Sequence, residues 1–184
     1  MHGTIYTAIL GNYDSLQPQF RQCADFVAFM DLSSGSVPSP WGVRSIERRL
    51  PTTRLDAKWY KIMPHRVFPE STHTLWIDGN LQLTPAFSLL QVLGSYLRAD
   101  VDLVLFPHPS RRCIYEEAWE CRRRELDASD RLYAQVARYT REGYPPNRGL
   151  MEAGFRNGYR APPRARSGTS SHGCAARFCS PFRA

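Results

Sequence analysis

The chain has 184 residues, of which 42% are hydrophobic and 22% charged, so it is long enough for one domain with a hydrophobic core and too short for two of ordinary size. Its net charge of +7 comes almost entirely from the last 29 residues, which hold six arginines and no acid. The preceding 155 residues carry 18 basic and 17 acidic side chains. That balance excludes a broad basic groove for nucleic acid in the body of the protein.

The five cysteines form no C-x-x-C pair and are odd in number, a pattern that suits a reducing compartment. No segment approaches the run of about 18–20 apolar residues that a membrane helix needs. The N-terminus lacks a basic region followed by an apolar core, so we expect no signal peptide. These features predict a cytoplasmic protein without a membrane span.

Strands and helices are expected to alternate along the body of the chain. Apolar and β-branched runs bounded by turn residues predict strands at 4–10, 25–31, 41–46, 73–78 and 101–106. Helical spacing predicts helices at 52–67, where Pro64 bends or ends the helix, at 85–99 and at 114–141. This alternation is typical of a three-layer α/β domain with a mostly parallel sheet.

Residues 156–184 differ in composition from the rest of the chain. They contain no valine, leucine, isoleucine or methionine and no acid. Such a segment cannot build a hydrophobic core, and we expect it to be disordered. The predicted domain therefore covers residues 1–155, and the tail covers 156–184.

Three candidate functional residues lie at the ends of expected strands. Asp31 and Asp78 each end one, and His108 follows a third. In open α/β sheets ligands bind beyond the carboxyl ends of the strands, so this shared position favours a site there. A lone histidine is more often structural, and a role for His108 in catalysis or acceptor binding is the alternative.

The segment TLWIDGNLQL (74–83) allows two interpretations of Asp78. Asp-Gly between two extended runs favours a hairpin with Gly79 at positive φ. The alternative is a site where Asp78 holds Mg²⁺ or Mn²⁺ against a diphosphate, Gly79 lets a ligand approach the backbone, and Asn80 adds a polar contact. The continuous apolar run of the strand and the late start of the next helix, at Pro85, favour the site.

Basic side chains precede this strand on the helix expected at 52–67. Arg54, Lys58 and Lys61 recur at helical spacing and share one face. These three side chains either form a solvent-exposed basic stripe, or one or two of them bind phosphate oxygens. Lys58 is the residue that we favour for phosphate.

Three glutamates are candidates for a general base. Glu116 and Glu117 are neighbours on an expected helix, so only one of them faces a given site, and Glu152 lies in GLMEAGF. Their alternative role is to stabilise a helix N-terminus. Arg111 and Arg112 either neutralise phosphate or an acidic sugar, or simply lie at the surface.

Five segments in the body of the chain together resemble those of a known family. They read ILGNYDSLQP, RLDAKWYKIMPHRVFPE, HTLWIDGNLQL, FPHPSRRCIYEEA and GYPPNRGLMEAG, and the resemblance runs from residue 5 to residue 155. The family is a bacterial and plant group of GT-A-like glycosyltransferase domains, long catalogued only as a domain of unknown function. The segments around WIDGN and HPSRRCIYEE are its specific motifs.

The resemblance implies a nucleotide-diphospho-sugar transferase fold and the transfer of a sugar from a nucleotide donor to the hydroxyl of a glycan or other acceptor, as in glycan or polysaccharide biosynthesis. Asp78 would be the metal-binding aspartate, holding Mn²⁺ or Mg²⁺. It stands here without the second aspartate that is usual in GT-A enzymes, which weakens the expectation of a metal. The expected donor-binding residues are Gly11, Asn12, Tyr13, Asp14, Asp31, Arg54, Lys58, Asn80 and Arg111.

Residues after Phe155 depart from the family, whose members continue with further helices and an Arg-Asp-Gln-type segment. GC-rich DNA read out of frame gives a composition of this kind, so we expect a frame shift near codon 156 and a C-terminally incomplete domain. A second hypothesis is therefore a truncated, inactive domain that binds nucleotide or glycan without turnover. A third is nucleic-acid binding through the arginine tail, which predicts a steep dependence on salt.

Overall fold

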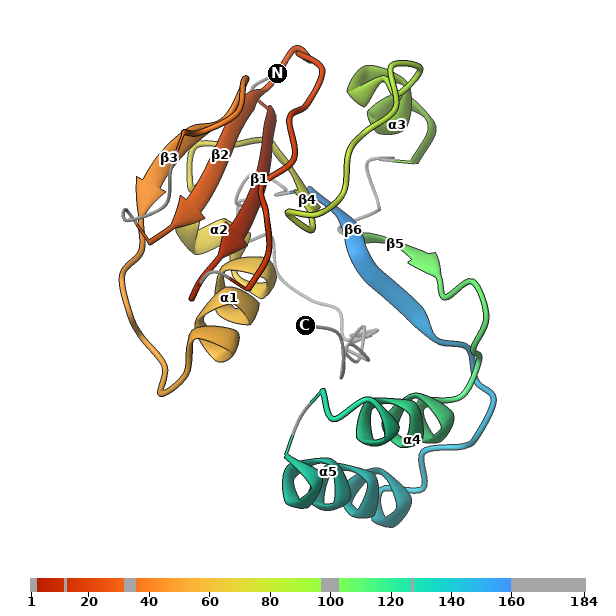
Figure 1. Cartoon of the computed structure of the whole chain (residues 1–184). Coiled ribbons are helices and arrows are strands. Elements are labelled where there is room, and N and C mark those ends of the chain that lie inside the picture. The colour runs from red at the N-terminus through yellow and green to blue at the C-terminus, as the bar shows by residue number, and fades with distance from the viewer. Residues whose placement is uncertain (1–2, 12, 32–35, 97–102, 127, 160–184) are drawn as a thin grey trace, which may run out of the picture. The chain divides into compact units, whose positions relative to one another are not determined.

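A mostly parallel β-sheet lies at the centre of the fold. The structure is a computed structural model that describes residues 3–11, 13–31, 36–96, 103–126 and 128–159. Within these ranges six strands form one sheet in the order β3-β2-β1-β4-β6-β5 (Figure 1). Their bounds are β1 (Gly3–Ile9), β2 (Asp25–Met30), β3 (Gly42–Ser45), β4 (His73–Ile77), β5 (Leu103–Pro107) and β6 (Met151–Tyr159).

The strand directions match the predicted fold class. β1 pairs in parallel with both β2 and β4, and β2 pairs in parallel with β3. β6 is antiparallel to β4 and was not predicted as a strand. The predicted α/β architecture with a mostly parallel sheet is confirmed.

The helices are α1 (Thr53–Ile62), α2 (Pro64–Val67), α3 (Leu89–Tyr96), α4 (Ile114–Arg123) and α5 (Ser129–Arg141). The chain divides into two compact units, each taken separately below. The first unit contains the described residues through Val104 and those from Gly154, and the second contains those from Leu105 to Ala153. None of the helices within the described ranges is long and apolar enough to cross a membrane.

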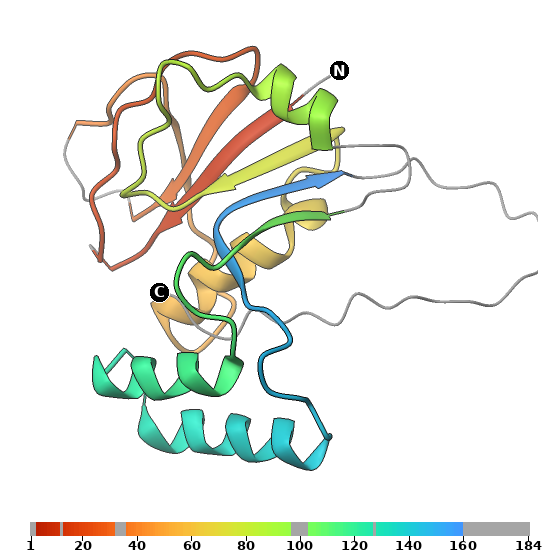
Figure 2. The ribbon, with the colours of Figure 1, turned by 90° about the vertical axis from the view of Figure 1, so that its right-hand side faces the viewer.

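Both faces of the sheet in the first unit are covered, which gives the predicted three layers (Figure 2). On one face, Tyr60 of α1 and Phe68 after α2 pack against alternate strand residues. On the other face, Leu83 and Leu89 pack against the intervening ones. β4 is therefore buried on both sides, as its continuous apolar sequence predicts.

Pro64 separates α1 from α2, as predicted, but the helix expected at 114–141 is two helices. Glu125 adopts a left-handed φ of 54°, and the Leu126 N–H bonds to the carbonyl of Cys121 at 2.9 Å. The reversal brings α5 back beside α4, where Leu132 packs on Cys121 (Figure 1). The turn buries the apolar contact between α4 and α5. This burial explains why the chain turns instead of continuing as one exposed helix.

Two further boundaries differ from those expected. The helix predicted at 85–99 begins only at Leu89, because the side chain of Gln22 accepts from the Leu89 N–H at 3.2 Å and donates to the Phe87 carbonyl at 3.2 Å. β6 continues to Tyr159, four residues into the segment expected to be disordered, because its backbone pairs with β4. Residues 160–184 of the expected tail, like 97–102, lie outside the described residues.

Candidate functional site

The carboxyl ends of β1, β2 and β4 meet at one edge of the sheet. In the parallel register Ile9 is paired with Met30 and Tyr6 with Trp76, so the residues after these strands reach the same edge. There the Asp31 carboxylate accepts a hydrogen bond from the Gly11 N–H at 2.8 Å. The structure thus places two of the three strand-end candidates, Asp31 and Asp78, at this edge. The third, His108, follows β5 and belongs to the second unit.

Asp78 is held in a defined orientation at this edge. Its Oδ1 atom accepts one hydrogen bond from Nε1 of Trp76 at 2.7 Å and another from Nζ of Lys61 at 2.9 Å. The Lys61 ammonium also lies 5.0 Å from the centre of the Trp76 ring. The Asp78 side chain remains 28% exposed and that of Lys61 only 11%. The edge therefore holds a partly buried ion pair whose carboxylate is open to solvent.

Packing of α1 brings Lys61 to Asp78. The preceding residue, Tyr60, stacks on Phe29 of β2 with ring centres 4.4 Å apart. The Tyr6 hydroxyl donates to the backbone carbonyl of Lys61 at 3.2 Å. The last turn of α1 is thus anchored by two neighbouring strands of the sheet.

The start of α1 is anchored by the fully buried Asp56. Its Oδ1 accepts from the backbone N–H groups of Arg49 and Leu50 at 2.9 and 2.8 Å. Its Oδ2 pairs with Nε of Arg48 at 2.8 Å. The Thr52 hydroxyl caps the helix by accepting from the Leu55 N–H at 3.2 Å. Sequence analysis missed Asp56, although its place in the first turn is typical of an acidic residue at a helix N-terminus.

The loops after β1 and β4 are cross-linked. The Gln17 N–H donates to the Gly79 carbonyl at 3.0 Å. The buried Gln19 side chain donates to the Leu81 carbonyl at 2.8 Å and accepts from the Leu83 N–H at 2.9 Å. These bonds tie the loop expected to face a nucleotide to the turn that follows Asp78.

The hairpin interpretation of Asp78–Gly79 is wrong. The Leu81 N–H bonds to the Asp78 carbonyl at 2.9 Å, which closes a turn, but the partners of β4 are β1 and β6. A Cβ at Gly79 would lie 2.4 Å from Cδ1 of Ile9. The glycine is therefore required by packing against β1, where the sequence suggested close approach of a ligand.

The other predicted donor-binding residues have varied surroundings. Tyr13 and Asn80 are exposed, and the Asp14 carboxylate accepts from the N–H of the next residue at 3.0 Å. Arg54 and Lys58 are partly buried on α1. The contact with Asp78 is made by Lys61, which the sequence placed on the same face without favouring it. Asn12 lies outside the described residues.

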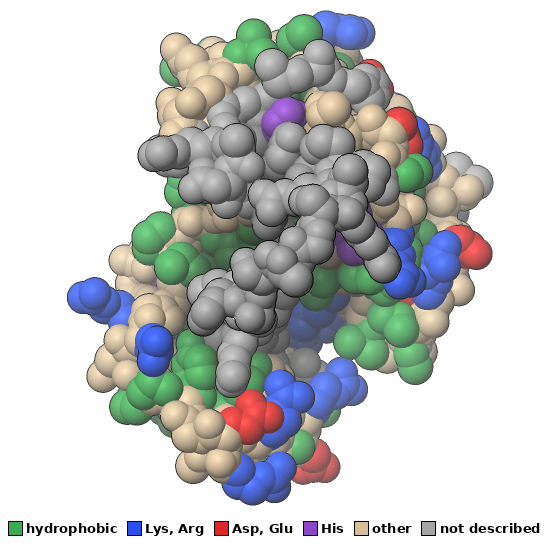
Figure 3. All heavy atoms as spheres, turned by 180° about the vertical axis from the view of Figure 1, so that it is seen from behind, with side chains coloured by type: hydrophobic (Ala, Val, Ile, Leu, Met, Phe, Trp, Pro, Cys, Tyr) green, Lys and Arg blue, Asp and Glu red, His purple; other side chains and the backbone are tan. Residues whose placement is uncertain are grey.

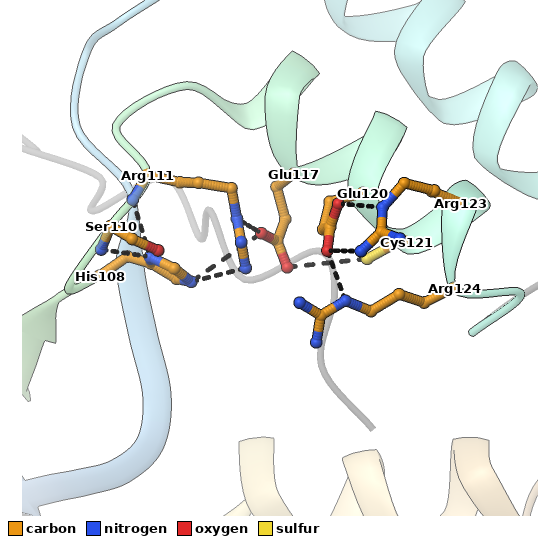
Figure 4. A network of polar contacts seen from close by, with 8 residues as sticks. All are labelled: His108, Ser110, Arg111, Glu117, Glu120, Cys121, Arg123 and Arg124. Atoms are coloured by element: carbon orange, nitrogen blue, oxygen red, sulfur yellow. Dashed lines mark hydrogen bonds and ion pairs between the residues drawn. The ribbon is translucent and has the colours of Figure 1, made fainter.

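The second unit contains a buried polar cluster formed by His108, Arg111 and Glu117 (Figure 4). Arg111 Nε donates to Glu117 Oε2, and Arg111 Nη2 lies 2.8 Å from His108 Nε2. The Cys121 thiol donates to Glu117 Oε1 at 3.6 Å. Both carboxylate oxygens of Glu117 are therefore engaged, which favours a structural role over that of a base.

Both ring nitrogens of His108 face hydrogen-bond donors. Nδ1 accepts from the N–H groups of Ser110 and Arg111 at 3.2 and 3.0 Å. Nε2 lies 2.8 Å from Arg111 Nη2 and 3.9 Å from Glu117 Oε2. His108 thus closes the turn between β5 and α4, the structural role that the sequence allowed.

The remaining candidates of the second unit lie near its surface. Glu116 and Arg112 are exposed, and the side chain of Glu152 lies outside the described residues. A shallow groove of about 450 Å³ runs along α4 between Arg111, Tyr115, Glu116, Trp119 and Glu120. Burial raises the pKa of the nearby Cys113 thiol, but backbone N–H groups of Asn147, Glu116 and Tyr115 outweigh it, so this pKa lies below its usual value.

Asp78 offers few ligands for a metal. No group of three His, Cys, Asp or Glu side chains suited to a metal ion occurs in the described part of the chain. Both hydrogen bonds to the Asp78 carboxylate go to Oδ1, which leaves Oδ2 as a possible ligand. A Mg²⁺ ion needs only one or two carboxylates when phosphates and water complete its six positions. The site fits a divalent cation that arrives together with a diphosphate.

Comparison with known proteins gives one family. The family model described as TOD1/MUCI70, glycosyltransferase-like domain, matches residues 42–149, which include Lys61, Asp78 and His108. No curated protein and no solved structure matches the chain. The match covers more than half of the 184 residues and confirms the predicted glycosyltransferase-like family. The chain belongs to the TOD1/MUCI70 glycosyltransferase-like domain family.

Proposed function

We propose that this protein transfers a sugar from a nucleotide-sugar donor to the hydroxyl of a glycan or other acceptor. The observation that carries the proposal is the Lys61–Asp78 pair at the carboxyl edge of the parallel strands, in a chain of a glycosyltransferase-like family. Such an edge is where open α/β sheets bind their ligands. The loop that begins at Gly11, tied to the Asp78 turn through Gln17, would line the nucleotide.

The leaving group of this reaction is a nucleoside diphosphate, whose developing negative charge must be stabilised. Asp78 Oδ2 would hold Mn²⁺ or Mg²⁺ bound at the same time by the diphosphate, and the cation would supply Lewis-acid stabilisation. The protein's own contribution is to orient Asp78, since Trp76 and Lys61 both bond its other oxygen.

An inverting transfer also needs a base for the acceptor hydroxyl. Glu117 is bonded to Arg111 and Cys121, so the exposed Glu116 is the better of the two neighbouring candidates. Glu152 stays a prediction from the sequence. The five cysteines, odd in number and without a C-x-x-C pair, suit a reducing compartment, and we propose the cytoplasm.

Thermal unfolding with UDP and Mn²⁺, separately and together, tests the donor site. A ligand at about one hundred times its dissociation constant adds roughly 2.7 kcal/mol, a measurable rise in melting temperature. The proposal predicts the largest rise with both ligands, and Asp78→Asn should lose the part that depends on Mn²⁺. Glu70→Asn, an exposed change elsewhere in the first unit, is the control.

Turnover is tested by screening nucleotide sugars for release of the nucleoside diphosphate in the presence of acceptor glycans. Binding with transfer supports the enzyme. Binding of nucleotide without transfer from any donor would instead support the truncated, non-catalytic domain. A cooperatively folding chain that binds none of UDP, GDP and ADP, with or without Mn²⁺, would contradict the donor site itself.

A further inference from the structure

Lys61 is a cation located at the edge where the proposed donor binds. It belongs to the last turn of α1, yet its side chain reaches the end of β4 and ends at Asp78. Its ammonium lies against the Trp76 ring and is 2.9 Å from the carboxylate. A salt bridge that served only to attach α1 to the sheet could be fully buried. The side chain of Asp78, however, is 28% exposed.

The surroundings increase the effect of the Lys61 charge. The Lys61 side chain is only 11% exposed, and its ammonium lies 2.9 Å from the Asp78 carboxylate. Charges at a site of reduced dielectric attract one another more strongly than in water. Lysine binds phosphate as a compact point charge, without the fixed geometry that arginine demands.

We infer that Lys61 binds the diphosphate of the donor directly and provides a permanent cation, so that nucleotide affinity persists when no divalent metal is present. The inference rests on the proposed function and assigns to Lys61 the phosphate contact that sequence analysis favoured for Lys58. Asp78 then has two tasks, to position the Lys61 ammonium through Oδ1 and to offer Oδ2 to a metal.

The test measures the dissociation constant of UDP by calorimetry in excess chelator and again with Mn²⁺. Lys61→Met should weaken binding about 10- to 100-fold in both conditions, as expected for loss of one hydrogen bond to a charged group. Lys61→Arg should retain most of the affinity. Arg66→Met, an exposed basic residue of α2, should bind like the natural chain.

Inorganic pyrophosphate separates phosphate recognition from recognition of the base. The affinity of pyrophosphate, measured by its competition with UDP, should fall in Lys61→Met by the same factor as the affinity of UDP. Because Lys61→Met leaves Asp78 without its cation, the double variant Lys61→Met/Asp78→Asn is measured as well, with thermal unfolding of each variant as the check on folding. The double variant carries no charge at either position. A loss of UDP affinity in the double variant is therefore not caused by an unpaired carboxylate.

Three outcomes would overturn the inference. One is UDP binding that disappears entirely in chelator although it is strong with Mn²⁺. Another is unchanged affinity in folded Lys61→Met, and the third is a loss confined to Lys58→Met. In each of them nucleotide still binds, so the proposed function stands, whereas absence of binding to any nucleotide in any condition would overturn both.

Discussion

Gly79 and Ile9 are in such close contact that a Cβ atom at position 79 would lie 2.4 Å from Cδ1 and 2.8 Å from Cγ1 of Ile9. Ile9 is the last residue of β1, and Gly79 follows the aspartate at the end of β4. The glycine lets the turn after Asp78 lie directly on the neighbouring strand. The position of the Asp78 carboxylate therefore depends on a packing contact behind it.

Gly79→Ala should lower the free energy of unfolding by about 1–3 kcal/mol, the usual cost of overpacking a core. Urea denaturation measures this change in the free energy of unfolding. In an Ile9→Val background, which removes Cδ1, the same substitution should cost less, and a cost that stays equal would contradict the contact. Gly94→Ala in α3 is the control, because a Cβ there meets nothing within 4 Å and alanine favours a helix.

Asp56→Ala should destabilise the first unit by about 2–4 kcal/mol, because it removes the fully buried carboxylate that accepts from the backbone N–H groups of Arg49 and Leu50. Asp56→Asn retains one oxygen and should cost less. Chemical denaturation gives both values, and equal loss in the two variants would show that the negative charge, not the acceptor, matters. Glu70→Ala, at an exposed position, should stay within about 0.5 kcal/mol of the natural chain.

Neighbouring glutamates on α4 should respond differently to the same change. Glu117→Gln removes the charge opposite Arg111 in a buried cluster and should cost about 2–4 kcal/mol. Glu116→Gln, one residue away and exposed, should leave stability unchanged within about 0.5 kcal/mol. Thermal unfolding compares them. A stable Glu117→Gln variant that had lost sugar transfer would restore Glu117 as a candidate base.

Glu120 is a source of acid sensitivity in the second unit. Hydrogen bonds from Arg123 and Arg124 lower the pKa of Glu120 to about 2. Basic and acidic side chains lie side by side on the surface of the second unit (Figure 3). The side chains of Arg123 and Arg124 are 54% and 51% exposed, so their interactions with Glu120 are sensitive to salt.

Because the pKa of Glu120 is lower in the folded chain than in the unfolded one, the stabilisation is complete above about pH 4.3 and is lost as pH falls to about 2. Unfolding followed between pH 5 and 2 should be less pH-dependent in Glu120→Gln. Carboxyl NMR should show a titration midpoint near 2 at low salt that rises at high salt. A midpoint near 4 at low salt would contradict the arginine contacts.

The class of fold and the position of the candidate site could be predicted from local patterns in the sequence. Alternating apolar runs and helical periodicity are local signals, and they were sufficient for the parallel strands and for the break at Pro64. Asp78 and Asp31 were also identifiable, because a carboxylate directly after an apolar strand lies at the ligand-binding edge of an α/β sheet.

Which residues meet at that edge depends instead on contacts between elements that are far apart in the sequence. Lys58 and Lys61 share a helix face, and the choice between them depends on how Tyr60 packs on Phe29 and so rotates α1 over the sheet. The same holds for Gly79, which must lack a side chain because it packs against Ile9, and for β6, which forms by pairing with strands distant in the sequence such as β4. Periodicity describes which face of an element is apolar, but a contact between distant elements depends on the packing that brings them together.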